Sequence, residues 1–168
     1  IVFVTNGSVT ISEKQKSLFK KFPNTQVSVS IDGTGSLFEY LRWPGNWEVL
    51  LSNIREYKEI FSDVNVSYTI STLNFWDHAQ TIKWFESLNL NYNFNFVHYP
   101  AVFNVSEMPI ELKKKINSKH PLSKMITITG KEIAISDLRN EITRQDNLKK
   151  ISLKDYLPEV YKLIFIDS

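Results

Sequence analysis

Strand-like segments alternate with helix-like segments over residues 1–98, and this rhythm constrains the fold more than any other feature of the chain. The strand-like segments are residues 1–5, 26–31, 64–71 and 92–97. The helical patterns between them cover residues 11–22, 47–61 and 75–88. Repeated strand–helix units are typical of an α/β fold with a parallel sheet.

Two of the helical patterns carry clear signals of their own. Ser12 and Gln15 have the spacing of a capping box at the start of the first helix. Its predicted apolar stripe consists of Ile11, Leu18, Phe19 and Phe22. The second helix carries a stronger stripe, made of Trp47, Leu50, Leu51, Ile54, Tyr57 and Phe61. We expect both stripes to pack on the sheet, and residues 1–5 to form a buried strand.

The later strands combine one apolar face with one polar face, because side chains of a strand point alternately to its two sides. The polar members are Ser28, Ser30 and Asp32, then Asn65, Ser67, Thr69 and Ser71, then Asn93 and Asn95. Parallel strands covered by helices on both faces are apolar nearly throughout. The polar face therefore indicates either a curved sheet, such as part of a barrel, with a ligand near the carboxyl ends of the strands, or an open sheet with one wet face and no ligand.

The pattern changes after Pro100. The sequence predicts a short helix from Pro109 to about 117, a hairpin over 125–135 that turns at Gly130-Lys131, and helices near 136–147 and 152–165. Pro158 breaks or restarts the last helix. We therefore expect a strand–helix part over residues 1–100 and a small α+β C-terminal extension over residues 101–168.

Composition excludes several classes of function. The 20 Lys and Arg residues against 18 Asp and Glu give a net charge of +2 without a basic tract, so nucleic-acid binding gains no support. No apolar run approaches the roughly 20 residues that cross a bilayer, and nothing resembles a signal peptide, so we expect a soluble cytoplasmic protein without a membrane partner.

Cysteine is absent from the sequence, and its three histidines lack the spacing of metal ligands. The absence of cysteine excludes disulfides, thiol catalysis and any iron–sulfur cluster held by thiolates of this chain. We expect His78, His98 and His120 to be packing or surface residues.

Six motifs spread over nearly the whole chain carry a family resemblance. They are TNG at 5–7, SVSIDGTG at 28–35, LFEYLRWPGNW at 37–47, TLNFWD at 72–77, YPAVFNVSEMP at 99–109 and RQDNLKKISLKDYLP at 144–158. In order and spacing they resemble the later part of the radical S-adenosylmethionine (SAM) enzymes, in particular the subgroup with a twitch domain. The resemblance implies a partial (β/α) barrel fragment with parallel strands and outer helices, in which residues 1–100 form half of the barrel and residues 101–168 the C-terminal extension.

The resemblance also implies what lies outside this sequence. In the family, a CxxxCxxC loop holds a 4Fe-4S cluster and a GGE motif binds the amino group of SAM, and neither motif occurs here. The first strand of this chain resembles the third strand of the family. We therefore expect the C-terminal part of a radical SAM iron–sulfur oxidoreductase, whose full-length form cleaves SAM to a 5′-deoxyadenosyl radical and acts on an unknown substrate. Alone, the chain is expected to hold neither cofactor and to be inactive.

Six positions are implied as SAM-binding residues: Thr5, Asn6, Ser30, Asp32, Asn65 and Ser67. Thr5 matches a threonine that contacts SAM in related enzymes, and Ser30 matches a serine near its methionine or ribose portion. Asn65 stands where some relatives place a charged residue for the SAM carboxylate, which weakens that contact. The resemblance assigns no catalytic residue and no metal ligand to this chain, and locally Thr5, Asn6 and Asp32 are also common turn residues.

Other functions stay open at this point. The chain fits a non-catalytic binding or interaction module that kept the half-barrel, and it also fits an unrelated α/β domain that binds a nucleotide or sugar phosphate at residues 32–35. Arg42 and Trp43 either pack the loop after the second strand or contact a substrate. If the chain is a barrel fragment, residues 1–5 form an exposed edge, and we expect homo-oligomers through that edge.

Overall fold

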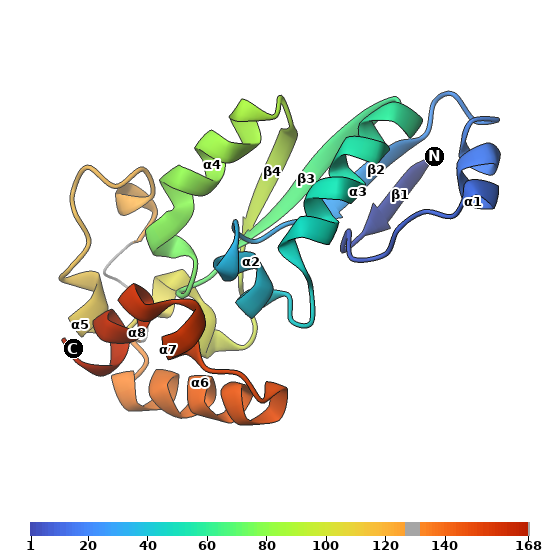
Figure 1. The fold of residues 1–168 in the computed structure, drawn as a ribbon. Helices are drawn as coiled ribbons and strands as arrows, with labels where there is room; N and C mark the ends of the chain where they lie inside the picture. Colours follow the sequence, from blue (N-terminus) through green and yellow to red (C-terminus); the bar gives the residue numbers. More distant parts are fainter. Residues whose placement is uncertain (127–131, 168) are drawn as a thin grey trace. The chain divides into compact units, whose positions relative to one another are not determined.

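The computed structural model describes residues 1–126 and 132–167 of the 168-residue chain. In these residues four strands form one sheet in the order β1-β2-β3-β4 (Figure 1). The strands are β1 (Val2–Thr5), β2 (Gln26–Ser30), β3 (Asp63–Ile70) and β4 (Asn91–Phe96). The pairs β1–β2 and β2–β3 are parallel. The predicted α/β class, with a parallel sheet and surrounding helices, is confirmed.

The described residues also form eight α-helices. They are α1 (Glu13–Phe19), α2 (Ser36–Leu41), α3 (Trp47–Ile60), α4 (His78–Ser87), α5 (Ile110–Lys113), α6 (Ile135–Lys149), α7 (Leu153–Tyr156) and α8 (Pro158–Phe165). Pro158 starts α8 at its first turn, as expected of a proline that restarts a helix. The sequence did not predict α2. The turn of the predicted hairpin, Gly130-Lys131, lies outside the described residues.

The chain divides into two compact units. Unit 1 comprises residues 1–69 and 81–95, and unit 2 comprises residues 70–80 and 96–168. The division into half of a barrel over 1–100 and an extension over 101–168 stays a prediction. No helix in the described residues has the length and apolar character that crossing a membrane requires.

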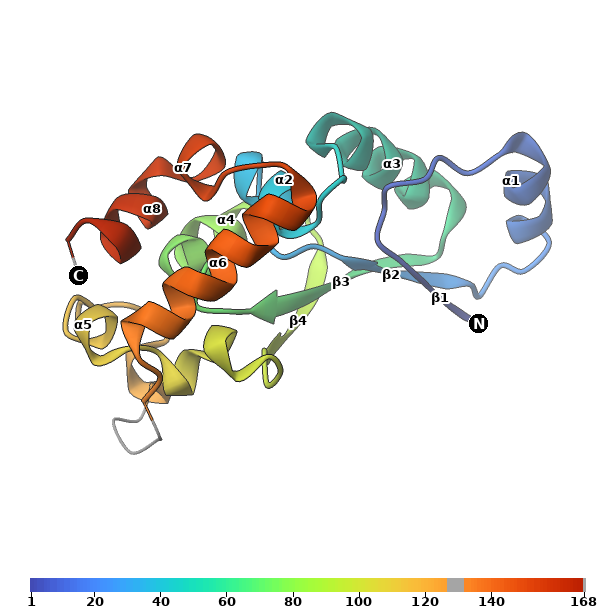
Figure 2. The same ribbon diagram turned by 90° about the horizontal axis from the view of Figure 1, so that it is seen from below.

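The core of unit 1 lies between the sheet and helix α3. Along β3, side chains alternate between buried and partly exposed, and β2 follows the same rule from Val27 onward. Figure 2 shows α1 and α3 on the same side of the strands. The buried residues on the facing surfaces include Val27, Val29, Val64, Val66 and Tyr68 of the strands and Leu50, Ile54 and Tyr57 of α3. The predicted two-faced sheet is thus confirmed in β2 and β3.

Strand β1 is not the buried strand that we predicted. Val2 and Val4 are 63% and 67% exposed, because β1 is at the edge of the sheet and pairs only with β2 among the described strands. The stripe on α1 is also shorter than expected, since Leu18 and Phe22 are about half exposed. The helix contacts the sheet mainly through Phe19, which packs against other aromatic rings. The predicted Ser12–Gln15 capping box is present.

The turn that follows β1 is fastened to α3. The amide of buried Asn53 donates a hydrogen bond to the carbonyl oxygen of Gly7 at 2.7 Å. Gly7 has a φ of +71°, and a Cβ atom there would lie 2.4 Å from Leu50 Cδ1 and 3.0 Å from Val29 Cγ1. Both the backbone conformation and the close approach of α3 therefore require glycine.

A histidine-containing cluster helps to build the core of unit 2. The ring of His120 stacks on Phe75, with 4.1 Å between ring centroids. Its Nε2 lies 3.1 Å from the Phe75 carbonyl oxygen, and its Nδ1 accepts a hydrogen bond from the backbone N–H of Leu122. This pattern fits the neutral imidazole, and burial lowers the pKa of His120 accordingly. His120 is a packing residue, as predicted.

Replacing Gly7 by alanine should destabilise the chain by about 3 kcal/mol, because it adds left-handed backbone strain of about 1–2 kcal/mol to overpacking of about 1–3 kcal/mol. The matched control is the same change in a Leu50→Ala background, which removes the Cδ1 atom that a Cβ at Gly7 would meet. In that background the alanine should cost mainly the backbone strain of about 1–2 kcal/mol. Urea denaturation measures the free energies of unfolding, and an equal cost of Gly7→Ala in both backgrounds would contradict the proposed close approach.

Candidate functional site

The register of the parallel strands brings the polar side chains of β2 and β3 together. Ser28 pairs with Asn65, and Ser30 pairs with Ser67, at neighbouring positions of the two strands. These four residues are on the face opposite the buried valines. The Oδ1 atom of Asn65 is buried and has no hydrogen-bond partner among the described residues. Since a buried amide oxygen without a partner is costly, this face has unused hydrogen-bonding capacity.

Thr5 and Asn6 instead make the turn that ends β1. Thr5 pairs in register with Val29, so it is on the helix side of the sheet, away from Ser30. Its Oγ1 accepts a hydrogen bond from the Gly7 N–H at 3.0 Å. Asn6 Oδ1 accepts bonds from both the N–H and the hydroxyl of Ser8. Thr5 and Asn6 therefore stabilise the turn, a role that is common for these residue types.

Asp32 joins three segments at the carboxyl end of β2. Its Oδ2 accepts a hydrogen bond from Arg42 Nε at 2.7 Å and lies 2.7 Å from Arg42 Nη2. Its Oδ1 accepts a bond from the Thr69 N–H of β3 at 2.9 Å. Burial raises the pKa of Asp32, and the charge of Arg42 and the Thr69 bond counteract this increase. The carboxylate thus has a structural role in this chain.

The pairing with Arg42 was not found from the sequence, although one signal was present. Arg42 is the only basic residue between Asp32 and the start of α3. Helix α2, which ends at Leu41, brings Arg42 to Asp32. The sequence did not predict this helix. Because Asp32 is directed to Arg42 and Thr69, the loop over residues 32–35 gives no support to a phosphate site.

The residues present fit the two implied cofactors unequally. Ser30, Ser67 and Asn65 offer hydroxyl and amide groups on one surface, which suits the sugar hydroxyls and amino-acid portion of SAM. A 4Fe-4S cluster does not fit, because the chain has no cysteine. Within residues 1–126 and 132–167, no three His, Asp or Glu side chains are grouped so as to hold a metal ion.

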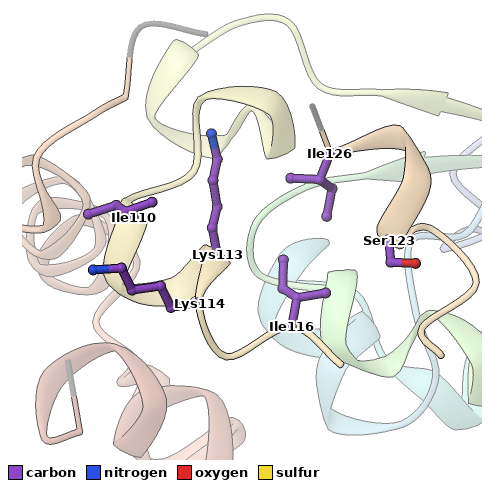
Figure 3. A pocket seen from close by; sticks show the side chains of 6 residues that line it. All are labelled: Ile110, Lys113, Lys114, Ile116, Ser123 and Ile126. Carbon is purple, nitrogen blue, oxygen red and sulfur yellow. The ribbon is translucent and has the colours of Figure 1, made fainter. Parts of the chain in front are cut away.

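A cavity of about 200 Å³ in unit 2 is mainly aliphatic (Figure 3). In Figure 3, Ile116 and Ile126 point toward one another across it. The Lys113 ammonium donates a hydrogen bond to the Ser106 carbonyl oxygen at 2.8 Å, so this charged group stabilises the fold. Among the described residues, those that line this cavity include no carboxylate or imidazole for acid–base chemistry.

We expect Asp32→Ala to cost about 2 kcal/mol of folding free energy, because the Thr69 N–H and the Arg42 guanidinium both lose a partly buried acceptor. Asp32→Asn keeps an acceptor for Thr69 and should cost about 1 kcal/mol. Asp63→Ala is the control, since its carboxylate makes an exposed bond to Asn91, and it should cost less than about 0.5 kcal/mol. Chemical denaturation measures the three losses of folding free energy and tests their predicted order. An Asp32→Ala variant as stable as the control would rule out the structural role of Asp32.

Comparisons with protein-family models and with curated protein sequences give no match. Among solved structures, an anaerobic sulfatase-maturating radical SAM enzyme (anSMEcpe) with bound AdoMet and the peptide Cp18Cys matches with a TM-score of 0.50 and 13% identity. The same enzyme with AdoMet and the peptide Kp18Cys has a TM-score of 0.49 and 12% identity.

The first match covers 93% of this chain and 42% of the enzyme, so this chain spans less than half of that protein. At such low identity the likeness concerns the fold alone. The chain has a fold similar to that of part of a radical SAM enzyme.

Proposed function

We propose that this chain is the C-terminal part of a radical SAM iron–sulfur oxidoreductase of the twitch-domain subgroup, and that its polar sheet face forms one wall of the SAM pocket. One observation carries the proposal. The register pairs of Ser30 with Ser67 and of Ser28 with Asn65 place four polar side chains on one face of a sheet whose fold is similar to that of an AdoMet-bound enzyme.

Within this proposal the six predicted positions have unequal roles. Ser30 and Ser67 are at the carboxyl-end level of the sheet, where ligands of such folds bind, and they contact the sugar or amino-acid portion of SAM. Asn65 supplies its buried Oδ1 atom as an acceptor. Asp32 supports this wall through its bonds to Arg42 and Thr69, and Thr5 and Asn6 shape the adjoining turn.

The redox part of the reaction must come from outside this sequence. Because the chain offers no thiolate, the 4Fe-4S cluster of the proposed full-length enzyme would be held by cysteines elsewhere. Reductive cleavage of SAM depends on an electron from that cluster, so the present chain alone should be inactive. The substrate is left unassigned.

SAM should bind this chain only weakly, because one wall of a pocket provides part of the contacts. We expect a millimolar dissociation constant in calorimetry and, in NMR spectra of the ¹⁵N-labelled chain, shifts at the backbone amides around Ser30 and Ser67. Ser30→Ala should weaken these shifts. Ser28→Ala is the matched control, since Ser28 is on the same face of the same strand, two residues farther from its carboxyl end.

Two results would count against the assignment. A micromolar dissociation constant would mean that the site is far more complete than one wall. No amide shift on β2 or β3 at millimolar SAM would reject this face as a SAM wall and favour a non-catalytic module.

We further propose that the chain forms homo-oligomers through β1. Among the described strands β1 has a neighbour on one side only, and Val2 and Val4 are mostly exposed. Such an edge presents unpaired N–H and C=O groups beside apolar side chains, which favours pairing with a second copy. Two β1 edges related by a two-fold axis would pair with one another.

Sedimentation equilibrium at high micromolar concentration should therefore detect dimers, and Val4→Lys should shift the chain toward the monomer. Val9→Lys provides the control, because Val9 is 71% exposed but outside the strand. A strict monomer at high micromolar concentration, or equal effects of the two lysines, would contradict association through this edge.

A further inference from the structure

A cavity of about 260 Å³ lies in unit 1, beside the ion pair of Arg42 and Asp32. It is lined by residues that include Asn6, Ser8, Phe38, Arg42, Trp43 and Gly45. Apart from Asn6, none of them belongs to the predicted SAM positions. The cavity is therefore a feature that the proposed function does not use.

The polar lining of this cavity consists mainly of unused hydrogen-bond donors. Arg42 uses Nε and one Nη2 hydrogen toward Asp32, which leaves the end of the guanidinium, Nη1 and the second Nη2 hydrogen, without a partner in the described residues. Asn6 uses Oδ1 within its own turn, and its Nδ2 amide has no described partner. The parallel N–H groups of a guanidinium end match the two oxygens of a carboxylate.

Electrostatics favours a single negative charge over a double one. Among the described residues, Arg42 is the only charged residue that lines the cavity, and its ion pair with Asp32 offsets part of its charge. A phosphate, with nearly two charges, would therefore meet too little positive potential to replace its hydration. A carboxylate needs only the bidentate bond and one amide donor.

The apolar part of the lining indicates the body of the ligand. The Trp43 side chain is 43% exposed, and the ring of Phe38 is buried behind the loop. The loop is held tightly, since Gly45 N–H donates to the Arg42 carbonyl oxygen at 2.8 Å. A Cβ atom at Gly45 would lie 2.8 Å from that same oxygen, so the close turn requires glycine. An exposed aromatic ring on a tight turn offers a surface for a flat or aliphatic group.

The volume limits the size of that group. At about 30 Å³ per water molecule, the cavity holds roughly nine waters, which corresponds to a ligand of about ten non-hydrogen atoms. This is below the range of about 300–1,000 Å³ that is common for drug-sized ligands. The part of a ligand that this cavity encloses is therefore small, and a larger molecule such as a nucleotide would extend out of it.

We propose that this cavity binds a small monocarboxylate with an aromatic or aliphatic body, through the guanidinium end of Arg42, the amide of Asn6 and the ring of Trp43. The inference does not rest on the proposed function. SAM also carries a carboxylate, so the test has to separate a second small ligand from the amino-acid end of SAM.

The probe is 3-phenylpropionate, added to the ¹⁵N-labelled chain. We expect a saturable shift of the Trp43 indole N–H signal, which the Trp43→Phe variant identifies by its loss. The neutral 3-phenylpropionamide should bind at least about tenfold more weakly, because it lacks the second carboxylate oxygen and the charge. Equal binding of the two probes, or no shift with either, would overturn the proposal.

Asn6→Asp is the decisive variant, because it keeps the acceptor for Ser8 while it replaces the amide donor by a carboxylate. It should weaken 3-phenylpropionate at least tenfold and leave the thermal unfolding midpoint unchanged. Asn24→Asp makes the same change in charge at an exposed asparagine that does not line the cavity, and it should bind the probe like the parent chain. If both variants bound 3-phenylpropionate equally weakly, the loss of binding would come from net charge alone and the proposed site would be refuted.

A competition experiment distinguishes the two sources of carboxylate. If the cavity takes a separate ligand, millimolar SAM leaves the shift caused by 3-phenylpropionate unchanged, and Ser30→Ala has no effect on it. If SAM displaces the probe, the cavity holds the carboxylate of SAM and the proposal of a second ligand fails, while the proposed SAM wall gains support.

Discussion

The in-register pairing of β2 with β3 is the constraint on which the rest of unit 1 depends. It aligns Val27 with Val64 and Val29 with Val66, which gives α3 one continuous apolar surface to cover. The same register aligns Ser28 with Asn65 and Ser30 with Ser67. Because side chains alternate with period two, a slip of one residue would exchange the two faces and bury the polar set. The helix-covered core and the polar wall are therefore two results of one register.

At the carboxyl ends of β1 and β2, the fold and the proposed binding of SAM compete for the same side chains. Thr5, Asn6 and Asp32 all carry groups that suit a ligand, yet each is used within the fold. Ser30, Ser67 and Asn65 are different, since they are on regular strands whose backbone bonds are satisfied by neighbouring strands. Their side chains are thus the better candidates for the proposed contact with SAM. Arg42 has one edge on Asp32 and lines a cavity with the other.

The hydrophobic core at the N-terminus is smaller than the sequence predicted, because β1 is exposed. Residues 1–5 have the composition of a buried strand, but burial of a strand depends on what pairs and packs beside it. At the edge of the described sheet, Val2 and Val4 are left in solvent on the face shared with Ser28 and Ser30, while Phe3 packs against Phe19. The same shortage of neighbouring surface shortens α1 and exposes Leu18 and Phe22.

The sequence by itself determined the α/β class, the positions of the strands, the Ser12 capping box, the restart at Pro158 and the polar face of β2 and β3, because these follow from local periodicity and from cap and turn residues. Only the tertiary structure decided that Thr5 is on the helix side, that Asp32 binds Arg42 and Thr69, and that the side chains of Val2 and Val4 are in solvent. Such features depend on which segments meet in space. Asp32 pairs with Arg42, ten residues later, and accepts a hydrogen bond from the N–H of Thr69, 37 residues later. No local sequence pattern predicts contacts between residues so far apart.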